Sequence, residues 1–324
     1  MSLDVENLTV YYASTSGDIK ALDGVTFQIA DGEIMGVAGE SGCGKTTLGK
    51  ALIRLDSRQR HIGGKAILDG EELIIDDPVA MRKRRYKDVS LIPQSAMSAM
   101  NPTRKIGKMT SDLLKAHGIK YDDVLPELQR RLRLVNLDPE ILDRYPGELS
   151  GGMKQRTVLV ISTLLNPSLL IADEVTSALD VTSQKAVARA LVEFRDAGFV
   201  KSMMIITHDI SVLFQVADTI LVMYAGHLAE KAPAKTIVEN ALHPYTKMLI
   251  GALPKVGAKY GDADSELVGI EGKPPWLGDP PVGCRFRERC PLAFDKCLQQ
   301  PPFVQVEPGH EIACWAVTDA LGLT

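Results

Sequence analysis

The sequence predicts an α/β protein in which a doubly wound sheet is joined to an antiparallel β subdomain, an inserted helical subdomain and a small cysteine-rich C-terminal module. Apolar strand-like runs alternate with helical runs after residue 45, as in sheets covered by helices on both faces. Between residues 95 and 147 only helical spacing of apolar residues remains. After residue 254, Pro and Gly become frequent and cysteines cluster.

Length and charge limit the function classes. The 324 residues can bury a substantial core without disulfides. Lys and Arg total 37 against 41 Asp and Glu, a net charge of −4, so no general basic field attracts nucleic acid or anionic lipid. The start, MSLDVENLTV, lacks the pattern of a signal peptide, and the most apolar stretch, 158–172, is interrupted by polar residues and too short to span a bilayer. We therefore expect a cytoplasmic protein that reaches a membrane only through other chains.

The expected elements follow in chain order. β-rich runs at 8–12, 25–29 and 34–38, separated by glycine turn signals, predict an antiparallel sheet that leads into a central strand. A helix is expected at 45–55, and the strands of the doubly wound sheet are expected at 89–92, 169–172, 203–207 and 219–223. Helices at 106–116 and 124–134 belong to the inserted subdomain, which spans about 95–147.

The C-terminal part begins with a strand-like HLAEKA, followed by helical runs at 234–240 and 245–253. We divide the chain into a nucleotide-binding domain, 1–230, and a C-terminal module, 231–324. Residues beyond 254 show little periodicity, so this tail is either a flexible linker or a small stapled appendage.

A phosphate-binding loop is predicted directly after the apolar run 34–38. The segment fits G-x-x-x-x-G-K-[ST] and comprises Gly39, Glu40, Ser41, Gly42, Cys43, Gly44, Lys45 and Thr46. Its glycines let backbone N–H groups approach phosphate, and the following helix presents its positive end. Lys45 is expected to reach the β- and γ-phosphates of ATP, Thr46 to ligate Mg²⁺, and Thr47 to donate to a phosphate nearer the ribose. A glycine turn with a solvated lysine is the competing interpretation.

Two carboxylates end the apolar run 169–172. Asp173 is placed to hold the Mg²⁺ sphere through water, and Glu174 to polarise the attacking water. Adjacent carboxylates at a strand end can instead cap the next helix. Together with the phosphate loop, the pair indicates a P-loop nucleotidase.

The segment 149–155, LSGGMKQ, resembles the signature motif of ABC ATPases, and the chain from about residue 3 resembles that family. The resemblance implies that Ser150 and Gly152, with Gly151 between them, serve a γ-phosphate held by an opposite subunit. A helix start with a hydroxyl and open N–H groups suits an anion. Helix capping by Ser150 alone is the ordinary alternative.

Further positions resemble the family pattern one by one. Tyr12 resembles the aromatic residue that stacks on adenine, with Tyr11 as the competing choice, since only one of them lies on the required face. Gln94 resembles the loop glutamine that touches Mg²⁺ and the attacking water. Asp180 resembles part of the loop that crosses the dimer interface, and His208 resembles the switch histidine that contacts the γ-phosphate and, with Glu174, positions water.

Two residues depart from the wider family pattern. Met153 stands where Gln is commoner, although Met is familiar in the peptide-importer branch, and Val175 replaces the usual Pro. The change at Val175 removes no chemical group, but it leaves the rigidity of its loop open. The resemblance implies that ATP closes a dimer of two nucleotide-binding domains and that hydrolysis reopens it, which would move docked permeases.

The tail carries a second resemblance. The segments HPYT, 243–246, and LP, 253–254, resemble the C-terminal module of ATPases of oligopeptide, dipeptide and nickel importers. In that branch a similar four-cysteine site holds a 4Fe-4S iron-sulfur cluster; the residues here are Cys284, Cys290, Cys297 and Cys314. Zinc sites favour tight C-x2-C pairs, which this sequence lacks, but zinc and unligated thiols remain alternatives. Cys43 is expected to contribute its backbone N–H and not to act as a nucleophile.

The resemblance implies an ATP-hydrolysing subunit of an ABC importer for oligopeptides or dipeptides, at the cytoplasmic face of the membrane. Expected partners are a second ABC ATPase subunit, two permeases and, indirectly, an extracellular substrate-binding protein. Oligosaccharide or nickel import is the alternative substrate class. An exporter half is disfavoured because membrane spans would be fused to it, and a soluble ABC ATPase acting on nucleic acid is disfavoured because the chain has one nucleotide domain and no heptads.

Overall fold

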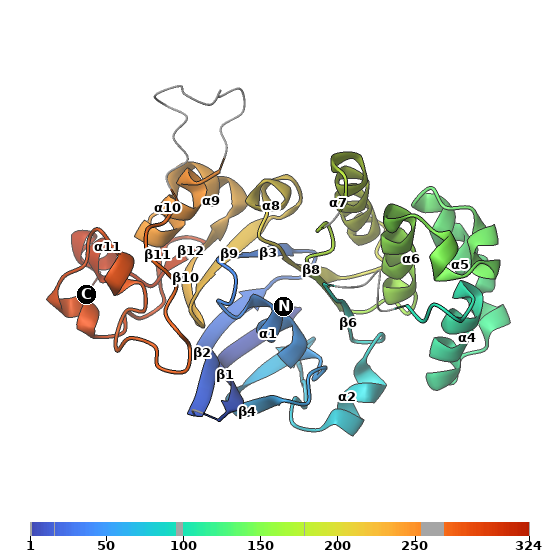
Figure 1. Ribbon diagram of the computed structural model, residues 1–324, viewed down its shortest axis with the longest axis horizontal. Coiled ribbons are helices and arrows are strands. Elements are labelled where there is room, and N and C mark those ends of the chain that lie inside the picture. The colour runs from blue at the N-terminus through green and yellow to red at the C-terminus, as the bar shows by residue number, and fades with distance from the viewer. Residues whose placement is uncertain (1, 16, 95–99, 178, 254–268, 324) are drawn as a thin grey trace.

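The computed structural model describes residues 2–15, 17–94, 100–177, 179–253 and 269–323. Its strands form a four-stranded antiparallel sheet in the order β2-β1-β4-β5 and an eight-stranded sheet in the order β11-β12-β10-β9-β3-β8-β7-β6 (Figure 1). The smaller sheet contains β1 (Leu3–Ser14), β2 (Gly17–Ile29), β4 (Gln59–Leu68) and β5 (Glu71–Glu72). β1 and β2 are much longer than the predicted runs, because their β-bulges interrupt strict alternation.

Five parallel strands form the centre of the larger sheet: β3 (Ile34–Ala38), β6 (Val89–Ile92), β7 (Leu169–Asp173), β8 (Ser202–Ile206) and β9 (Thr219–Tyr224). Every residue of β3, β6, β7 and β8 is buried, which explains their continuous apolar runs. The doubly wound prediction is confirmed for this part, and the observed strands lie within one residue of the expected ranges. Antiparallel strands at one edge make the whole sheet mixed.

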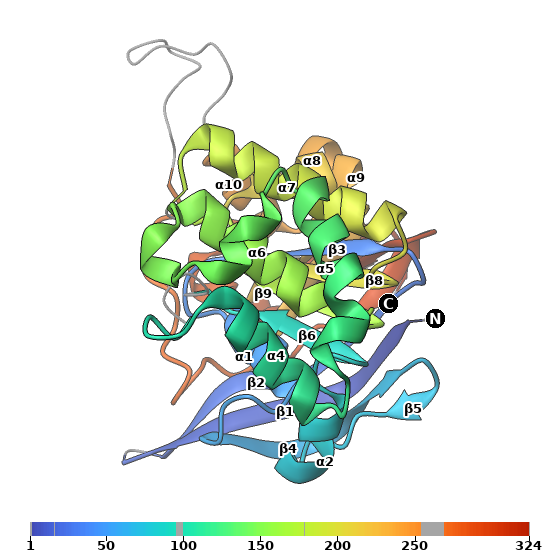
Figure 2. The ribbon, with the colours of Figure 1, turned by 90° about the vertical axis from the view of Figure 1, so that its right-hand side faces the viewer.

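The core divides into two clusters, one on each face of the parallel strands. In β3, Ile34 and Ala38 belong to one cluster, while Met35 and Val37 belong to the other, as strand alternation requires. Figures 1 and 2 show the antiparallel sheet on one side of these strands. The helices on the other side are α7 (Val181–Asp196), α8 (Ile210–Val216) and α9 (Ala234–Asn240).

Helix α1 (Lys45–Leu52) packs between the two sheets, where Leu48 is fully buried. It ends three residues before the predicted end at residue 55, and Arg54, just beyond it, has a positive φ of 50°. Helix α2 (Pro78–Arg84), capped by Asp77, was not predicted from the sequence. Among the residues described, no helix has both the length and the apolarity needed to cross a membrane.

The inserted helical part contains α4 (Ile106–Ala116), α5 (Tyr121–Leu134) and the short 3₁₀ helices η1 (Pro139–Asp143) and η2 (Pro146–Glu148). It packs on α6 (Gly151–Thr163), at the end of the molecule opposite the C-terminus (Figure 1). Both predicted helices are present, and α5 begins three residues before the expected residue 124. The predicted start of this part, 95–99, lies outside the described residues.

The C-terminal part continues the main sheet. β10 (His227–Pro233) pairs with β12 (His310–Ile312), which pairs with β11 (Val304–Glu307). Helices α10 (Pro244–Gly251) and α11 (Trp315–Ala320) and the 3₁₀ helices η3 (Arg287–Arg289) and η4 (Asp295–Leu298) complete it. The expected boundary after residue 230 falls inside β10, so in the described chain the two parts share one sheet. Residues 269–323 are packed against the remainder and do not form a free linker.

Candidate functional site

The loop between β3 and α1 takes a shape that only glycine permits at two positions. Gly39 has φ 144°, and a Cβ there would lie 2.2 Å from the carbonyl oxygen of Met223 in β9. Gly44 has φ 109°, and a Cβ there would lie 2.4 Å from the carbonyl oxygen of Ala21 in β2. The loop is therefore wedged between the two sheets, with no room for side chains at these points.

Lys45 folds back into this loop. Its side chain is buried, and its Nζ donates hydrogen bonds to the carbonyl oxygens of Gly39 at 2.7 Å and Glu40 at 2.9 Å. The ammonium group thus lies where a phosphate bound by the loop would meet it. Burial raises the pKa of the neighbouring Cys43 thiol, which keeps it neutral and supports a backbone role for this residue. Ser41 and Gly42 are exposed at the tip of the loop.

Glu40 has two partners that the sequence analysis missed. Arg289 donates to both carboxylate oxygens, at 2.7 and 3.0 Å, and the Tyr245 hydroxyl accepts a hydrogen bond from the Glu40 backbone N–H at 2.8 Å. Arg289 lies 249 positions along the chain from Glu40. No motif spacing could signal a contact over that separation.

Asp173 ends β7 beside the start of α1. Its carboxylate accepts a hydrogen bond from the Thr46 hydroxyl at 3.1 Å, and its side chain is buried. Burial raises the pKa of Asp173, and the charge of Glu174 adds to the rise. The pair offers two oxygen ligands of the kind that Mg²⁺ prefers, and a cation there would favour the ionised carboxylate. The donor set therefore fits the predicted metal.

Glu174 leaves the strand in the left-handed region, with φ 49°, while its N–H still bonds to the carbonyl oxygen of Ile206 at 2.7 Å. Its carboxylate accepts a hydrogen bond from Gln94 Nε2 at 2.7 Å and lies 3.3 Å from His208 Nδ1. Gln94 follows β6 and His208 follows β8, the two neighbours of β7. The structure thus brings all three predicted residues together at the carboxyl ends of adjacent parallel strands.

The two candidate tyrosines of β1 point to different neighbours. The Tyr12 hydroxyl lies 3.5 Å from Thr47 Oγ1 and accepts a hydrogen bond from Gln59 at 3.1 Å. The Tyr11 hydroxyl donates to Asp23 at 2.8 Å, and burial followed by this bond raises the pKa of Tyr11 to about 12. Tyr12 is therefore the tyrosine beside the phosphate loop.

The signature segment begins α6, with Ser150 as its N-cap accepting a hydrogen bond from the Met153 N–H at 3.3 Å. Asp180 caps α7 in the same way, and hydrogen bonds from Ser183 lower its pKa. The two helix starts are adjacent, because a Cβ on Gly152 would lie 3.0 Å from Ser183 Oγ. Among the described residues, none of 150–152 hydrogen-bonds to residues 39–47, and Ser150 is exposed. Gly151 is half-buried.

The four C-terminal cysteines gather in one region. The Cys284 N–H donates to the Cys297 carbonyl oxygen at 2.9 Å, and Cys297 and Cys314 are buried. Burial raises the pKa of Cys284 to about 11, and the charges of the other three cysteines add to the rise. However, within the described ranges no group of three or more His, Cys, Asp or Glu residues is arranged to hold a metal ion. The expected ligand geometry is therefore not formed here.

Three features together define a P-loop ATPase. A glycine-rich phosphate loop precedes a helix, and the Thr46–Asp173 pair beside it is suited to Mg²⁺. The Glu174 carboxylate is held between Gln94 and His208. The exposed start of α6 presents the positive end of its helix dipole.

Comparisons with known proteins agree with this class. The family model for ABC transporters matches residues 22–177, and the model for the oligopeptide/dipeptide transporter C-terminal region matches residues 229–297. The dimeric post-hydrolysis structure of the ATP-binding cassette MJ0796, bound to ADP and Pi, has a TM-score of 0.62 at 23% identity and covers 72% of this chain and 98% of that chain. That likeness shows the fold.

Curated relatives extend the similarity over nearly the full length. The chain is 36% identical to the probable peptide ABC transporter ATP-binding protein y4tR of Sinorhizobium fredii, covering 99% of this chain and 96% of the relative. It is also 36% identical to the dipeptide transport ATP-binding protein DppD of Caldanaerobacter subterraneus, over 96% of this chain and 95% of the relative. The identity to the oligopeptide transport ATP-binding protein OppD of Escherichia coli is 36% as well, over 98% of this chain and 94% of the relative. The chain therefore belongs to the ATP-binding subunits of ABC transporters and hydrolyses ATP to drive transport.

Proposed function

We propose that this chain energises the uptake of oligopeptides or dipeptides as one ATPase subunit of an ABC importer. The proposal of ATP hydrolysis rests on the position of Glu174. Its carboxylate is held by Gln94 and His208 next to the Thr46–Asp173 pair. The peptide part is supported by the curated relatives, which are named for peptide, dipeptide and oligopeptide transport. No described observation favours oligosaccharide or nickel over peptide.

The residues suggest a direct hydrolytic step. Lys45 and the N–H groups of residues 42–46 hold the phosphates, and Tyr12 stacks on the adenine. Glu174 orients a water whose oxygen bonds to the γ-phosphorus while the bond to the β,γ-bridging oxygen breaks, and the water proton passes through the carboxylate to the released phosphate. Mg²⁺, when bound, offsets charge on the phosphates. Gln94 and His208 keep the Glu174 carboxylate aimed at that water.

The site is completed by a second ATPase subunit, identical or homologous. Ser150, Gly151 and Gly152 present the positive end of α6, and Asp180 starts the neighbouring helix. Within the described residues they make no hydrogen bond to the chain's own phosphate loop, so they are available to meet the γ-phosphate of a partner. The dimeric ATP-binding cassette found among the solved structures supports this arrangement.

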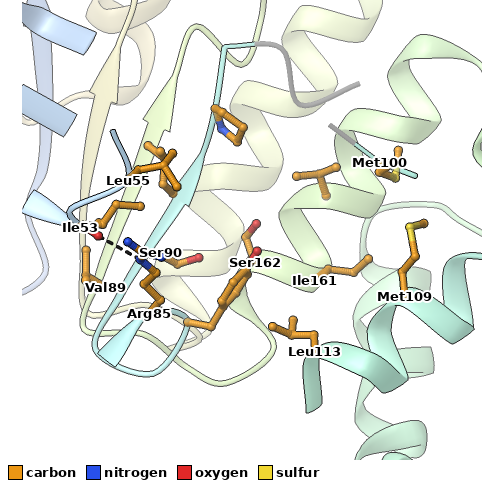
Figure 3. Close-up of a pocket in the computed structure, with 14 residues that line it drawn as sticks. Ile53, Leu55, Arg85, Val89, Ser90, Met100, Met109, Leu113, Ile161 and Ser162 are labelled. Carbon is orange, nitrogen blue, oxygen red and sulfur yellow. Dashed lines mark hydrogen bonds between the residues drawn. The ribbon is translucent and has the colours of Figure 1, made fainter. Parts of the chain in front are cut away.

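A groove beside the site is suited to a permease segment. The groove has a volume of about 290 Å³ and lies between β6 and helices α4 and α6. It is lined mainly by apolar residues such as Leu55, Met100, Met109 and Leu113 (Figure 3). Ser90 Oγ is buried there without a hydrogen-bond partner among the described residues. β6 leads through Pro93 to Gln94, so a permease helix in this groove would contact the element that carries an active-site residue. Such docking places the chain at the cytoplasmic face of a membrane, and an extracellular binding protein selects the substrate.

The four cysteines hold a 4Fe-4S cluster in this proposal, with zinc as the alternative. Support comes from the bond between the Cys284 N–H and the Cys297 carbonyl oxygen and from the burial of Cys297 and Cys314, not from a formed ligand geometry. Iron and sulfide analysis and visible absorption after anaerobic purification should detect a cluster that Cys297→Ser removes. Stoichiometric zinc in its place, or neither metal, would contradict the assignment. No step of ATP hydrolysis is assigned to this site.

The hydrolytic proposal is tested with Glu174→Gln. Loss of the carboxylate should lower hydrolysis about a hundredfold or more while ATP still binds. The variant should then accumulate as a dimer during size-exclusion chromatography in ATP and Mg²⁺. Glu239→Gln, an exposed position on α9, is the control. Persistent hydrolysis without a dimer would show that the assigned water-activating residue is wrong.

The substrate is tested with the complete importer in liposomes. ATP hydrolysis should be stimulated when the binding protein is loaded with a short peptide. Stimulation by an oligosaccharide or Ni²⁺, with none by peptides, would overturn the substrate class and leave the ATPase assignment intact.

A further inference from the structure

One C-terminal segment, 284–290, reaches into the nucleotide-binding core. Arg285 donates hydrogen bonds to the Asp23 carboxylate and to the carbonyl oxygen of Ala225. The Phe286 ring packs against the rings of Tyr224 and Tyr245, with centroid separations of 5.1 and 5.3 Å. Arg289 binds Glu40. The Arg285 and Arg289 side chains are only 5% and 6% exposed, so these contacts are buried connections between the C-terminal part and the phosphate loop.

The Arg289 guanidinium has a partner for each of its five N–H donors. Besides the two Glu40 carboxylate oxygens, it donates to the Tyr224 hydroxyl at 3.1 Å and to the carbonyl oxygens of Ile270 at 3.2 Å and Glu271 at 2.9 Å. A planar guanidinium fixed at five points holds a carboxylate in one orientation. Glu40 is therefore positioned by its side chain as well as by its backbone bond to Tyr245.

This contact bears on the ATP site because Glu40 is part of the phosphate loop. Its carbonyl oxygen accepts a hydrogen bond from Lys45, the residue aimed at the phosphates. Its carboxylate places a negative charge in a loop that must bind a polyanion. An adjacent buried cation offsets that charge, whereas an unpaired carboxylate would repel ATP.

We propose that Arg289 is a positioning residue for ATP binding: it neutralises Glu40 and fixes the phosphate loop in the shape that accepts the phosphates. The C-terminal part of the chain thus completes a nucleotide site whose motifs all lie before residue 209. The proposal rests on ATP binding at residues 39–47, and it assigns Arg289 no contact with ATP.

The test uses the full chain and four variants. Arg289→Ala should raise the KM for ATP about tenfold or more while kcat changes less, because the lost interaction acts on binding. Arg289→Lys should recover part of the affinity, since it restores the charge without the fork geometry. Arg289→Ala combined with Glu40→Gln should recover most of it, since no charge remains to be balanced. Arg287→Ala, in the same segment, is the matched control: within the described part of the chain its side chain bonds to the Val282 carbonyl oxygen and lies 4.0 Å from Glu288.

Equilibrium binding of ATP and Mg²⁺, measured in the Glu174→Gln background, separates affinity from turnover. Each variant is first checked for native circular dichroism. If folded Arg289→Ala binds ATP as well as Arg287→Ala does, the proposal is overturned. If the double variant binds as weakly as Arg289→Ala, charge neutralisation is the wrong mechanism. If the unmodified chain does not bind ATP, the proposed function itself is refuted. That outcome differs from a failure of the Arg289 proposal, in which the unmodified chain still binds ATP.

Discussion

Strand alternation determines which of the adjacent residues Tyr11 and Tyr12 lies beside the phosphate loop. Tyr12 is near Thr47, whereas Tyr11 bonds to Asp23. We predict that Tyr12→Ala weakens ATP binding about tenfold, because stacking on a base is worth about 1 to 3 kcal/mol. Titration of ATP in the Glu174→Gln background measures the change.

The control for this prediction is Tyr11→Phe, which removes only the hydroxyl bonded to Asp23. It should leave ATP affinity unchanged within about twofold and cost about 1 kcal/mol of stability. Tyr12→Trp should retain affinity, since the aromatic face is kept. Equal loss of binding in Tyr11→Phe and Tyr12→Ala would reverse the assignment of the adenine-stacking residue.

His243 caps α10 with Nδ1, which accepts the Tyr245 N–H at 3.0 Å. Burial lowers its pKa to about 4. Since this value is below the ordinary 6.5 of the unfolded chain, the neutral ring contributes stability at higher pH that is lost as pH falls from about 6.5 to about 4. A shift of this size corresponds to about 3 kcal/mol.

We therefore predict that His243→Asn, whose side-chain oxygen can keep the cap, flattens the fall in unfolding free energy between pH 6.5 and about 4.5. Urea unfolding at several pH values measures this change in unfolding free energy. Some decline should remain, because burial lowers the pKa of His227 to about 4 as well. An unchanged pH dependence in His243→Asn would mean that His243 takes no part in it.

Among the elements, α4 forms one wall of the apolar groove at β6. We predict that Leu113→Glu leaves ATP hydrolysis by the isolated chain within about twofold, because Leu113 lines the groove and is not one of the residues assigned to the ATP site. The same change should abolish transport by the complete importer. Transport and hydrolysis are compared in liposomes that contain the permeases.

Ala116→Glu, an exposed position at the end of α4, is the matched control for the groove and should transport normally. Transport by Leu113→Glu at the unmodified rate would exclude this groove as the permease contact. Loss of hydrolysis in the isolated variant would instead indicate a structural defect.

At the scale of the whole molecule, we propose that a second ATPase subunit completes the site. We predict that Ser150→Arg leaves ATP binding by the single chain within about twofold. In the Glu174→Gln background it should prevent the ATP-dependent dimer, because the bulky side chain would occupy the position of the partner's γ-phosphate. Size-exclusion chromatography with light scattering measures the dimer.

Ala116→Arg adds the same side chain at an exposed position and should leave the dimer intact. If Ser150→Arg also forms the ATP-dependent dimer, the signature helix does not contribute to a shared site. The roles assigned to Gly151, Gly152 and Asp180 would then fall with it.

Some elements that the sequence predicts poorly have identifiable causes. β4 contains Gly63 and Gly64 and pairs with shifts in register, so neither strand propensity nor alternation signals it. α2 has seven residues and buries only Met81 among them, so it shows no helical period of apolar residues. α7 does carry buried residues at helical spacing, Val187, Ala190, Leu191 and Phe194, and a scan of its period would have found it.

The sequence was sufficient to predict the phosphate loop, the strand-end carboxylates and the parallel strands, because their signals lie within a few consecutive residues. These signals are the glycines that the loop shape requires and the apolar runs that burial on both faces requires. It also placed Gln94 and His208 after strands, although their contact with Glu174 depends on strand order.

The folded structure alone shows how distant segments meet. The pairing of β10 with β12, the choice of Tyr12 over Tyr11 and the bond between Arg289 and Glu40 join residues separated by up to 249 positions. It also showed the four cysteines gathered without forming a metal-binding arrangement. Such contacts arise from packing of complete elements, and their free energy depends on burial and geometry that no local sequence period encodes.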